Sequence, residues 1–353
     1  MIVSNPAAKD KGNGASGHAT IRDVARAAAV STATVSATVN ASAYVSPALQ
    51  QRVWAAIERV GYQPDAVARS LRKGVTRMLG LLLADITNPF TTAVVHSMEA
   101  TAHARGYTLM LCNSDEDAAK EETHLRLLRT HRADGVVLMP VGTGADYAAR
   151  MARLLRIPAV LVDRRIRDLA LDLVTTDGAA GTRAAIAHIL ALGHRRIGIV
   201  TGPPGVSAGD ERLAGYRAAL DGQGIPFDPR LARSGDFRHG PAYAATRAIL
   251  EGEDPPTALF ACNNLMAIGM MRAIADLGLS CPGDLSVACF DDFEWATAFQ
   301  PRLTTVAQPT DAIGATAVEL LLDRLAGAAP DEPRQVVLAP RLIVRDSCAA
   351  PSR

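Results

Sequence analysis

The sequence predicts an α/β protein in which a small helical domain precedes a core of two lobes, each built on a doubly wound parallel sheet. Three observations support this prediction. The chain has 353 residues, more than the roughly 100 to 200 of a usual single domain. Three short helical patterns lie close together before residue 62. From Arg77 onward, short apolar runs alternate with helical stretches, which is typical of parallel sheets covered by helices.

The composition is that of a folded globular protein. Hydrophobic residues make up 48% and charged residues 21%, which excludes a disordered or fibrous chain. There is no long apolar run, and no apolar segment follows the opening residues, so we expect neither export nor a membrane span. An odd set of cysteines without a C-x-x-C pair predicts reduced thiols and a cytoplasmic protein. The five are Cys112, Cys262, Cys281, Cys289 and Cys348.

The charge is unevenly distributed. The net charge is only +1. The first 74 residues contain nine cations and four carboxylates, which is +5, so the other 279 residues carry −4. A basic head on a mildly acidic body indicates a polyanionic partner for the head alone, although a stretch with this charge can also be an ordinary solvated surface.

The helical domain is expected over 19–63, after a disordered tail at 1–18. Each of its three helices has a start signal in the sequence, and Val35 and Val39 of the second helix are expected to face inward. The start signals are Thr20 with Asp23 as a capping box, Ser31, and Ser46 followed by Pro47, and Gly61 ends the third helix.

The core is expected over 77–353 as an N-lobe (about 77–176 and 309–334) and a C-lobe (about 177–308 and 335–348). A cleft between such lobes is the natural ligand site. The predicted buried strands are 79–84, 107–112, 135–139, 158–162, 196–202, 257–263 and 285–291, and the predicted helices are 91–105, 118–131, 179–192, 210–222, 240–251 and 264–277.

The first two helices and their tight turn form a helix-turn-helix. This arrangement places the second helix in the major groove of DNA. The outer face of that helix is made of small or hydrogen-bonding side chains, which can approach base edges closely. A plain three-helix bundle with a polar exterior is the alternative. The candidate DNA-binding residues on this face are Thr32, Ala33, Thr34, Ser36, Ala37 and Asn40.

A short basic segment follows, and we expect a hinge helix and linker over 64–76. The stretch from Pro64 to Gly74 is about two turns, too short for a stable isolated helix. If it orders on DNA, its cations can contact phosphates while Leu71 inserts between base steps of the minor groove. The alternative is a linker whose Leu71 packs on the core. The candidate DNA-binding residues here are Ala68, Arg69, Leu71 and Arg72.

The chain resembles the LacI/GalR family of bacterial transcription repressors over residues 19–348. The resemblance implies a homodimer on a palindromic operator with Leu71 at its centre, and a periplasmic-binding-protein-like (type I) core that closes on a small effector. No C-terminal leucine-heptad helix follows, so we expect a dimer. The matching segments are TIRDVARAAAVSTATVS (20–36), GYQPDAVARSLRKG (61–74), DITNPF (85–90), GHRRIGIVTGP (193–203), ERLAGYRAAL (211–220), NNLMAIG (263–269), FDD (290–292), PRLTTVAQP (301–309) and LIVRDS (342–347).

Two residues depart from the family pattern. Ala37 stands where the family most often has arginine, which removes a bidentate reader of guanine and predicts an unusual half-site. Asn264 stands where the family usually has aspartate, which affects a polar contact or a helix cap near the cleft.

The resemblance also implies a set of effector-binding residues. Most follow predicted strands, where ligands bind at the carboxyl edge of a parallel sheet. Aromatic rings beside carboxylates, amides and guanidinium groups suit a sugar or sugar derivative. Arg164 and Arg212 also leave room for a sugar acid or phosphate, unless one of them pairs with Asp163 or Asp291. The candidate residues are Phe90, Asp163, Arg164, Arg212, Phe237, Asn263 and Asp291.

Catalytic motifs are missing from the sequence. It contains no G-x-G-x-x-G after a first strand, no Walker lysine, no G-x-S-x-G and no H-E-x-x-H. We expect no enzyme, no metal site and no cofactor. Asp291 and Asp292 are adjacent at a strand end and should point in opposite directions, so they do not form an acid/base pair. An exported sugar-binding protein or a sugar or nucleoside enzyme on the same core remain the alternatives.

Overall fold

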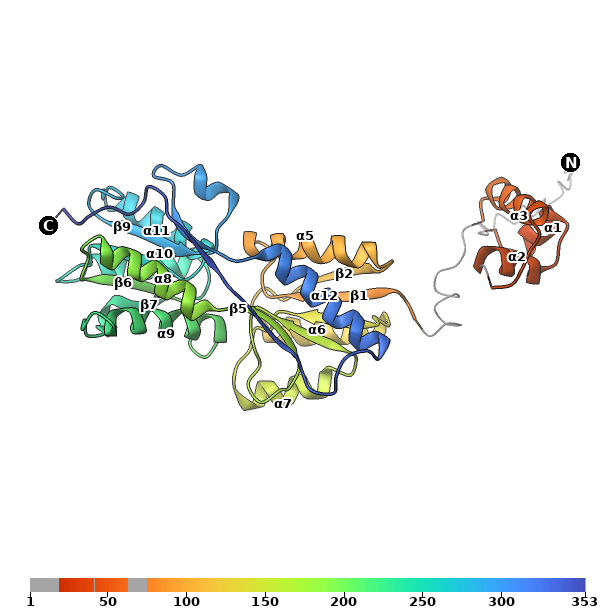
Figure 1. Ribbon diagram of the computed structural model, residues 1–353, viewed down its shortest axis with the longest axis horizontal. Coiled ribbons are helices and arrows are strands. Elements are labelled where there is room, and N and C mark those ends of the chain that lie inside the picture. Colours follow the sequence, from red (N-terminus) through yellow and green to blue (C-terminus); the bar gives the residue numbers. More distant parts are fainter. Residues whose placement is uncertain (1–18, 41, 63–74, 353) are drawn as a thin grey trace, which may run out of the picture. The chain divides into compact units, whose positions relative to one another are not determined.

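The computed structural model describes residues 19–40, 42–62 and 75–352, and it separates into two compact units, Met1–Thr76 and Arg77–Arg353 (Figure 1). The predicted tail at 1–18 and the hinge candidates lie outside the described residues. Those hinge candidates are Ala68, Arg69, Leu71 and Arg72.

The first unit contains the predicted helix-turn-helix and a third helix. Val24, Val35, Val53 and Ile57 form its buried centre. Its elements are α1 (Ile21–Ala28), α2 (Thr32–Asn40) and α3 (Pro47–Val60).

Capping hydrogen bonds and backbone conformation at the helix ends explain where these helices begin and end. The Asp23 carboxylate accepts a hydrogen bond from the backbone N of Thr20 at 2.9 Å, as the capping box predicts, and a further one from the Thr20 hydroxyl at 2.6 Å. Ser31 Oγ accepts from Thr34 N at 3.1 Å at the start of α2. Gly61 adopts a left-handed φ of 65° after α3, which glycine tolerates without strain.

The first lobe of the core is a six-stranded parallel sheet in the order β11-β5-β4-β3-β1-β2. Helices α5 and α12 cover one face, and α6 and α7 cover the other (Figure 1). Alternation along β1 produces this arrangement, because Leu79, Leu81 and Leu83 face α5 and α12 while Leu82 faces α6 and α7. The elements are β1 (Met78–Leu83), α5 (Pro89–Ala104), β2 (Thr108–Asn113), α6 (Ala118–Thr130), β3 (Gly135–Leu138), α7 (Gly144–Leu154), β4 (Ala159–Val162), β5 (Asp172–Thr176), α12 (Thr310–Ala326) and β11 (Gln335–Leu338).

The second lobe repeats this plan with the strand order β12-β10-β9-β8-β6-β7, in which only β12 is antiparallel to its neighbour. Its core contains the rings of Tyr216, Phe260 and Phe290. The elements are α8 (Gly178–Ala191), β6 (Ile197–Thr201), α9 (Ser207–Asp221), η1 (Pro229–Leu231), β7 (Ala232–Ser234), α10 (His239–Leu250), β8 (Ala258–Ala261), α11 (Asn264–Asp276), β9 (Ser286–Phe290), η2 (Glu294–Thr297), β10 (Thr304–Ala307) and β12 (Arg341–Ile343).

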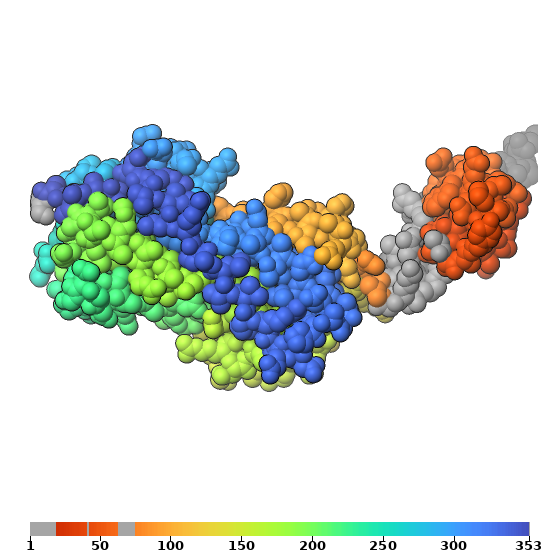
Figure 2. Space-filling model, in the orientation of Figure 1, coloured from red at the N-terminus to blue at the C-terminus, as the bar shows by residue number. Residues whose placement is uncertain are grey.

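The chain passes from one lobe to the other after β5, after β10 and after β11, so C-terminal residues lie on both lobes (Figure 2). The prediction that 335–348 belongs to the C-lobe is therefore wrong for its first strand. β11 pairs in parallel with β5, from Gln335 opposite Leu173 to Leu338 opposite Thr176. In this pairing, β11 provides hydrogen-bond partners for the backbone groups at the outer edge of β5. The chain then passes to the second lobe after β11.

None of the helices in the described ranges combines the length and apolarity that a bilayer crossing requires.

Candidate functional site

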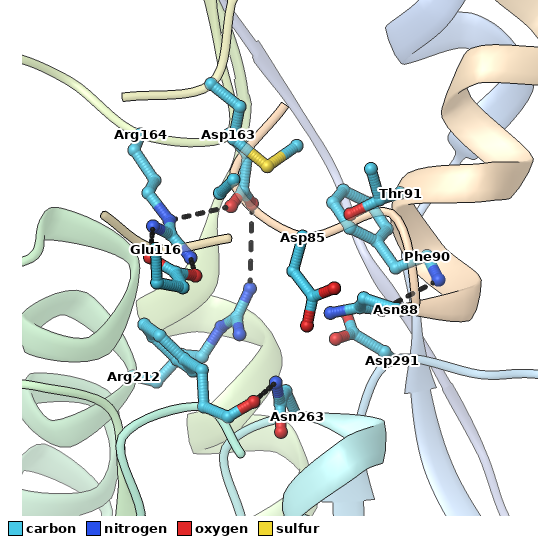
Figure 3. Close-up of a pocket in the computed structure, with 13 residues that line it drawn as sticks. Asp85, Asn88, Phe90, Thr91, Glu116, Asp163, Arg164, Arg212, Asn263 and Asp291 are labelled. Carbon is cyan, nitrogen blue, oxygen red and sulfur yellow. Dashed lines mark hydrogen bonds and ion pairs between the residues drawn. The ribbon is translucent and has the colours of Figure 1, made fainter. Parts of the chain in front are cut away.

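A cavity lies between the two lobes, where the carboxyl ends of both sheets meet. The structure brings all seven predicted effector residues together there, and their side chains approach one space from both lobes (Figure 3). The lining residues are Ala84, Asp85, Asn88, Phe90, Thr91, Glu116, Met139, Asp163, Arg164, Arg212, Phe237, Asn263 and Asp291.

The first lobe supplies most of its lining side chains from the ends of β1 and β4. Asn88 caps α5, and its Oδ1 accepts a hydrogen bond from Phe90 N at 2.9 Å, which fixes Phe90 on the first helical turn. Asp163 follows β4 with a φ of 64°, while its backbone N still donates to Val174 O at 2.9 Å. The left-handed turn ends the strand and leaves the Asp163 and Arg164 side chains beside the cavity.

The second lobe supplies Asn263 and Asp291 in the same way. Asn263 caps α11: its Oδ1 accepts from Met266 N at 2.8 Å, and its Nδ2 donates to Phe237 O at 3.2 Å. Asp291 follows β9 with a φ of 71° and accepts a hydrogen bond from Gln308 Nε2 at 2.6 Å. One amide therefore fixes both a helix start and the loop that carries Phe237.

The neighbouring Asp292 points away from this cavity, as predicted. Its carboxylate accepts hydrogen bonds from Arg345 (2.8 and 3.0 Å) and from the Thr305 hydroxyl (2.8 Å). Asp291 and Asp292 thus have separate partners, and no shared proton joins them.

Both cleft arginines are held by protein groups. Arg164 donates to both Glu116 oxygens (2.6 and 2.8 Å) and to Pro140 O at 3.3 Å, while its Nε lies 3.6 Å from Asp163. The sequence-based alternative, in which a cleft arginine pairs with Asp163, agrees with these ion pairs, and Glu116 is an additional bidentate partner that was not predicted. This pair consumes most of the donor capacity of Arg164.

Arg212 is bound more loosely. Its Nη1 donates to Cys262 O at 2.6 Å, its Nη2 lies 3.8 Å from Asp163, and its guanidinium stacks 4.0 Å from the centre of the Phe290 ring. Among the described residues, Nε of Arg212 has no hydrogen-bond partner. Arg212 therefore keeps donor capacity for a ligand in the cleft.

Burial sets the protonation of the Asp291 carboxyl. Burial raises its pKa to about 6, against the opposing effects of Arg212 and the Gln308 hydrogen bond. Asp291 therefore changes charge close to neutral pH, in a cavity that already contains Asp85 and Asp163.

The cavity is narrow in this form of the protein. The space open to the centre of a water-sized sphere is about 20 Å³. One water needs about 10 to 15 Å³ by this measure, so a sugar ring can enter only when the lobes separate or side chains move.

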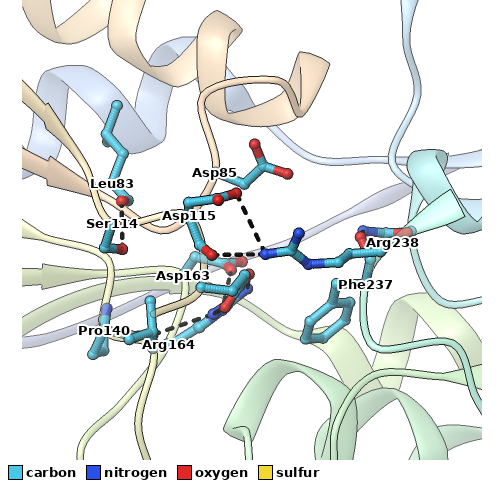
Figure 4. A network of polar contacts seen from close by, with 12 residues as sticks. Leu83, Asp85, Ser114, Asp115, Pro140, Asp163, Arg164, Phe237 and Arg238 are labelled. Carbon is cyan, nitrogen blue, oxygen red and sulfur yellow. Dashed lines mark hydrogen bonds and ion pairs between the residues drawn. The ribbon is translucent and has the colours of Figure 1, made fainter. Parts of the chain in front are cut away.

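Polar contacts across the cleft hold the lobes in this form (Figure 4). Arg238 Nη2 donates to Asp115 O at 2.6 Å and lies 3.3 Å from its carboxylate. Arg165 N donates to Ser207 Oγ at 2.9 Å. The Arg164 guanidinium also lies 5.0 Å from the centre of the Phe237 ring. Arg238, Asp115 and Arg165 each directly adjoin a lining residue in the chain, so breaking these contacts when the cleft opens also affects the lining.

A second buried carboxylate supports the first lobe behind the cleft. Glu121 is fully buried on α6 and accepts hydrogen bonds from the Tyr147 hydroxyl (2.8 and 2.9 Å) and from Val141 N (3.1 Å). Burial raises the pKa of Glu121 to about 7. These bonds fix the loop whose Pro140 carbonyl accepts from Arg164.

The candidate DNA-binding face lies on α2. Thr32 and Ala33 are exposed, and the other four candidates are partly exposed. Val35 is fully buried and Val39 packs against the same centre, as predicted. Asn40 Nδ2 donates to Ser36 O at 2.8 Å, so part of its hydrogen-bonding capacity is used within the helix.

Two cations of the basic head have structural roles. Arg52 and Arg59 of α3 each donate at 2.6 Å to carbonyls near the end of α1, those of Ala28 and Ala27. Their charge therefore stabilises the bundle, while Arg22 and Arg26 remain exposed.

Sequence reasoning did not select several cleft residues. Asp85 and Asn88 lie in the segment DITNPF, where only Phe90 was chosen, so their position after a strand was the missed signal. Glu116 lies in a loop with a φ of 57°, and no sequence pattern marks it. Asn264, which the sequence marked as a departure from the family pattern, is not among the lining residues; it is fully buried, and within the described residues its side-chain amide has no hydrogen-bond partner.

Comparison with known proteins agrees with this architecture. Residues 20–65 match the family model of bacterial regulatory proteins, lacI family, and residues 186–348 match the periplasmic binding protein-like domain. The repressor PurR of Aliivibrio salmonicida is 36% identical over 329 residues, covering 93% of this chain and 98% of that protein. The ribose operon repressor of Escherichia coli K12 is 35% identical over 329 residues, covering 93% and 99%.

Solved structures show the same similarity. A lac repressor dimer bound to operator and the anti-inducer ONPF has a TM-score of 0.85 and 28% identity, covering 95% of this chain and all of that one. The complex of the transcriptional regulator CelR with cellobiose has a TM-score of 0.71 and 31% identity, covering 94% and 100%.

A DNA-binding helix-turn-helix domain followed by a periplasmic-binding-protein-like core defines a transcriptional repressor with an effector-binding domain. The chain belongs to the LacI/GalR family of bacterial transcription repressors. The predicted family and fold class are confirmed.

Proposed function

We propose that this repressor binds a palindromic operator as a homodimer and that a small neutral sugar or sugar derivative in the interlobe cleft controls this binding. The observation that carries the proposal is the convergence of the seven predicted residues from both lobes on one cavity. A ligand held by both lobes favours the closed form, so it can shift the equilibrium of the whole core.

The lining chemistry favours a polyhydroxylated ring. Carboxylates and amides accept hydrogen bonds from hydroxyls, and Arg212 donates to them. Phe90 and Phe237 are both buried beside these groups and offer apolar surface to the carbon faces of a ring.

The charge balance favours a neutral ligand over a sugar acid or phosphate. Arg164 is neutralised by Glu116, and Arg212 is the one other arginine among the lining residues. An anionic ligand would also face the carboxylates Asp85, Asp163 and Asp291. Like charges this close in a buried site repel one another, while hydroxyl groups can donate to the same carboxylates.

The similar proteins support both parts of the proposal. One is a ribose operon repressor, another is a regulator in complex with cellobiose, and a third is a repressor dimer bound to operator. A palindromic operator needs two copies of the head related by a two-fold axis. The DNA-binding residues would be those of α2 named above, with Leu71 of the hinge at the operator centre, and the protein would act in the cytoplasm.

Calorimetry on the full-length protein tests the effector class. The panel contains neutral pentoses, hexoses and disaccharides, the corresponding sugar acids and sugar phosphates, and purines. We expect binding of a neutral sugar that is lost in Asp291→Ala and kept in the matched control Asp292→Asn, whose carboxyl lies outside the cavity. Preferential binding of purines or sugar acids, or unchanged affinity in Asp291→Ala, would overturn the proposal.

A further inference from the structure

The first lobe carries two arginine runs that neither the cleft nor the helix-turn-helix uses. Residues 126–132 and 150–156 each contain three arginines spaced three residues apart. All are exposed except Arg150, which is partly exposed. We call the six together the arginine surface: Arg126, Arg129, Arg132, Arg150, Arg153 and Arg156.

The fold brings the two runs side by side. Helices α6 and α7 pack on the same face of the first sheet, and the hydrogen bond from Tyr147 to Glu121 sets their register. The runs begin five residues after Glu121 and three residues after Tyr147, so at 1.5 Å per residue they start within about 3 Å of the same height. Both helices end at the edge where the strands begin.

The same edge is where the chain enters the core. Arg77 directly precedes β1, and its backbone N donates to Asp134 Oδ2 at 2.8 Å, two residues beyond the first run. The linker to the DNA-binding unit therefore starts next to the arginine surface.

The charge on this edge is not balanced locally. Over 126–134 and 149–158 there are six arginines and one carboxylate, Asp134. Arg126 pairs with Glu122, but in the part of the chain that the structure describes the guanidiniums of Arg129 and Arg153 have no hydrogen-bond or ion-pair partner. Since residues 75–353 carry −4 in total, these cations are gathered against an acidic background.

Helix ends account for only part of this surface. A cation in the last turn stabilises the helix dipole, and Arg156 Nε donates to Arg153 O at 3.0 Å as a cap. That role needs one arginine at each helix end. Three arginines near the end of each of these two neighbouring helices are more than helix capping requires.

We propose that the arginine surface binds the phosphate backbone of the DNA that flanks the operator; this rests on the proposed function. Guanidinium groups bind phosphate oxygens in bidentate pairs. Segment 63–74 spans at most about 45 Å even when fully extended, at about 3.5 Å per residue. DNA bound by the head is therefore held at high effective concentration near this surface.

The test compares two duplexes and two double variants of the full-length protein. An operator is first selected from random duplexes, then made alone and with two turns (about 20 base pairs) of added duplex on each side. Arg129→Gln/Arg153→Gln is compared with Arg183→Gln/Arg233→Gln, which removes the same charge from exposed sites on the second lobe. Thermal unfolding of each variant verifies the fold.

On the long duplex, we expect Arg129→Gln/Arg153→Gln to bind more weakly. The slope of log K against log salt should fall by about 1 for each phosphate that the variant leaves unneutralised. The short duplex and the control variant should show no such change. Equal salt slopes for the two variants on the long duplex, or an equal weakening on both duplexes, would overturn the inference. If the wild-type protein is specific for neither duplex, the proposed function itself fails.

Discussion

Two buried carboxylates give this protein its expected pH sensitivity at the scale of single residues. Asp291 lines the cleft, and Glu121 supports the loop behind it. Burial raises the pKa of both groups, to about 6 and about 7 respectively. Each therefore becomes charged within the range that a binding or stability experiment can cover.

Glu121 should make stability fall as pH rises. Its pKa is higher in the folded protein than in the unfolded chain, so its contribution is fully present below about pH 4.5 and is lost as pH rises through about 7. Glu121→Gln stays neutral. Between pH 5 and pH 8, the free energy of unfolding of the wild type should fall relative to the variant by about 2.5 kcal/mol, measured by urea denaturation. Parallel pH profiles would contradict this.

Asp291 should make effector binding stronger as pH rises through about 6. The ionised carboxylate accepts hydrogen bonds from ligand hydroxyls more strongly than the protonated form does. The charged and polar groups that face it are Arg212, Gln308 and Asp163. Calorimetry from pH 5 to 7 should show rising affinity in the wild type and weaker, pH-independent binding in Asp291→Asn. An equal pH dependence in both would assign the effect to another group.

The sequence predicted which residues meet in the cleft, but it did not predict all of the ion pairs that these residues form. Six of the seven predicted residues follow strand ends or begin helices behind them, so parallel topology alone brings them together. The Arg164 partner was missed because Glu116 is a single carboxylate in a loop, 48 residues away in the chain. Pairing of this kind depends on loop backbone geometry, which local sequence does not specify.

Among the secondary-structure elements, helices α8 and α9 pack so closely that a larger side chain at their contact should destabilise the core. A Cβ on Gly215 of α9 would lie 2.3 Å from Ala179 O of α8, so the two helices meet there with no room for a side chain. A backbone atom cannot move aside as a flexible side chain can. Packing of α8 against α9 therefore depends on this glycine.

Gly215→Ala should destabilise the core by about 1 to 3 kcal/mol, the usual cost of overpacking. The matched control is Gly222→Ala, at the end of the same helix, where the nearest atom to the new Cβ is 3.4 Å away. Urea denaturation should show a change of no more than about 0.5 kcal/mol in the control. Equal stabilities for the two variants would show that α8 and α9 can separate without cost.

Five strands were not predicted, namely β5, β7, β10, β11 and β12, and three of them have physical reasons for being missed. β7 and β12 have three residues each, too few to show a hydrophobic period. β11 lies at a sheet edge beside β5, more than 150 residues earlier in the chain, so its lobe is decided by pairing and not by neighbouring sequence. The seven strands that were predicted are apolar runs, for which local pattern is sufficient to identify a strand. Six of them are buried, but the expectation of a buried strand at 107–112 is wrong, because β2 lies at the edge of its sheet and only Cys112 is buried.

For the whole molecule, binding to a palindromic operator requires two copies of the chain. Two heads related by a two-fold axis are needed to bind both halves of a palindrome. Sedimentation at micromolar concentration, with operator present, should show one dimer per duplex. A persistent monomer that still binds specifically would contradict this.

Effector binding and operator binding should be coupled through the cleft. The most direct measurement is operator affinity in the presence and absence of the sugar identified by calorimetry, together with sugar affinity in the presence and absence of operator. We predict that both affinities change by the same factor, between about 5-fold and 150-fold, because coupling free energy is reciprocal. Arg212→Ala should still bind operator if the sugar acts as an inducer, and should lose the response. Sugar binding in the cleft with no change in operator affinity would contradict the account.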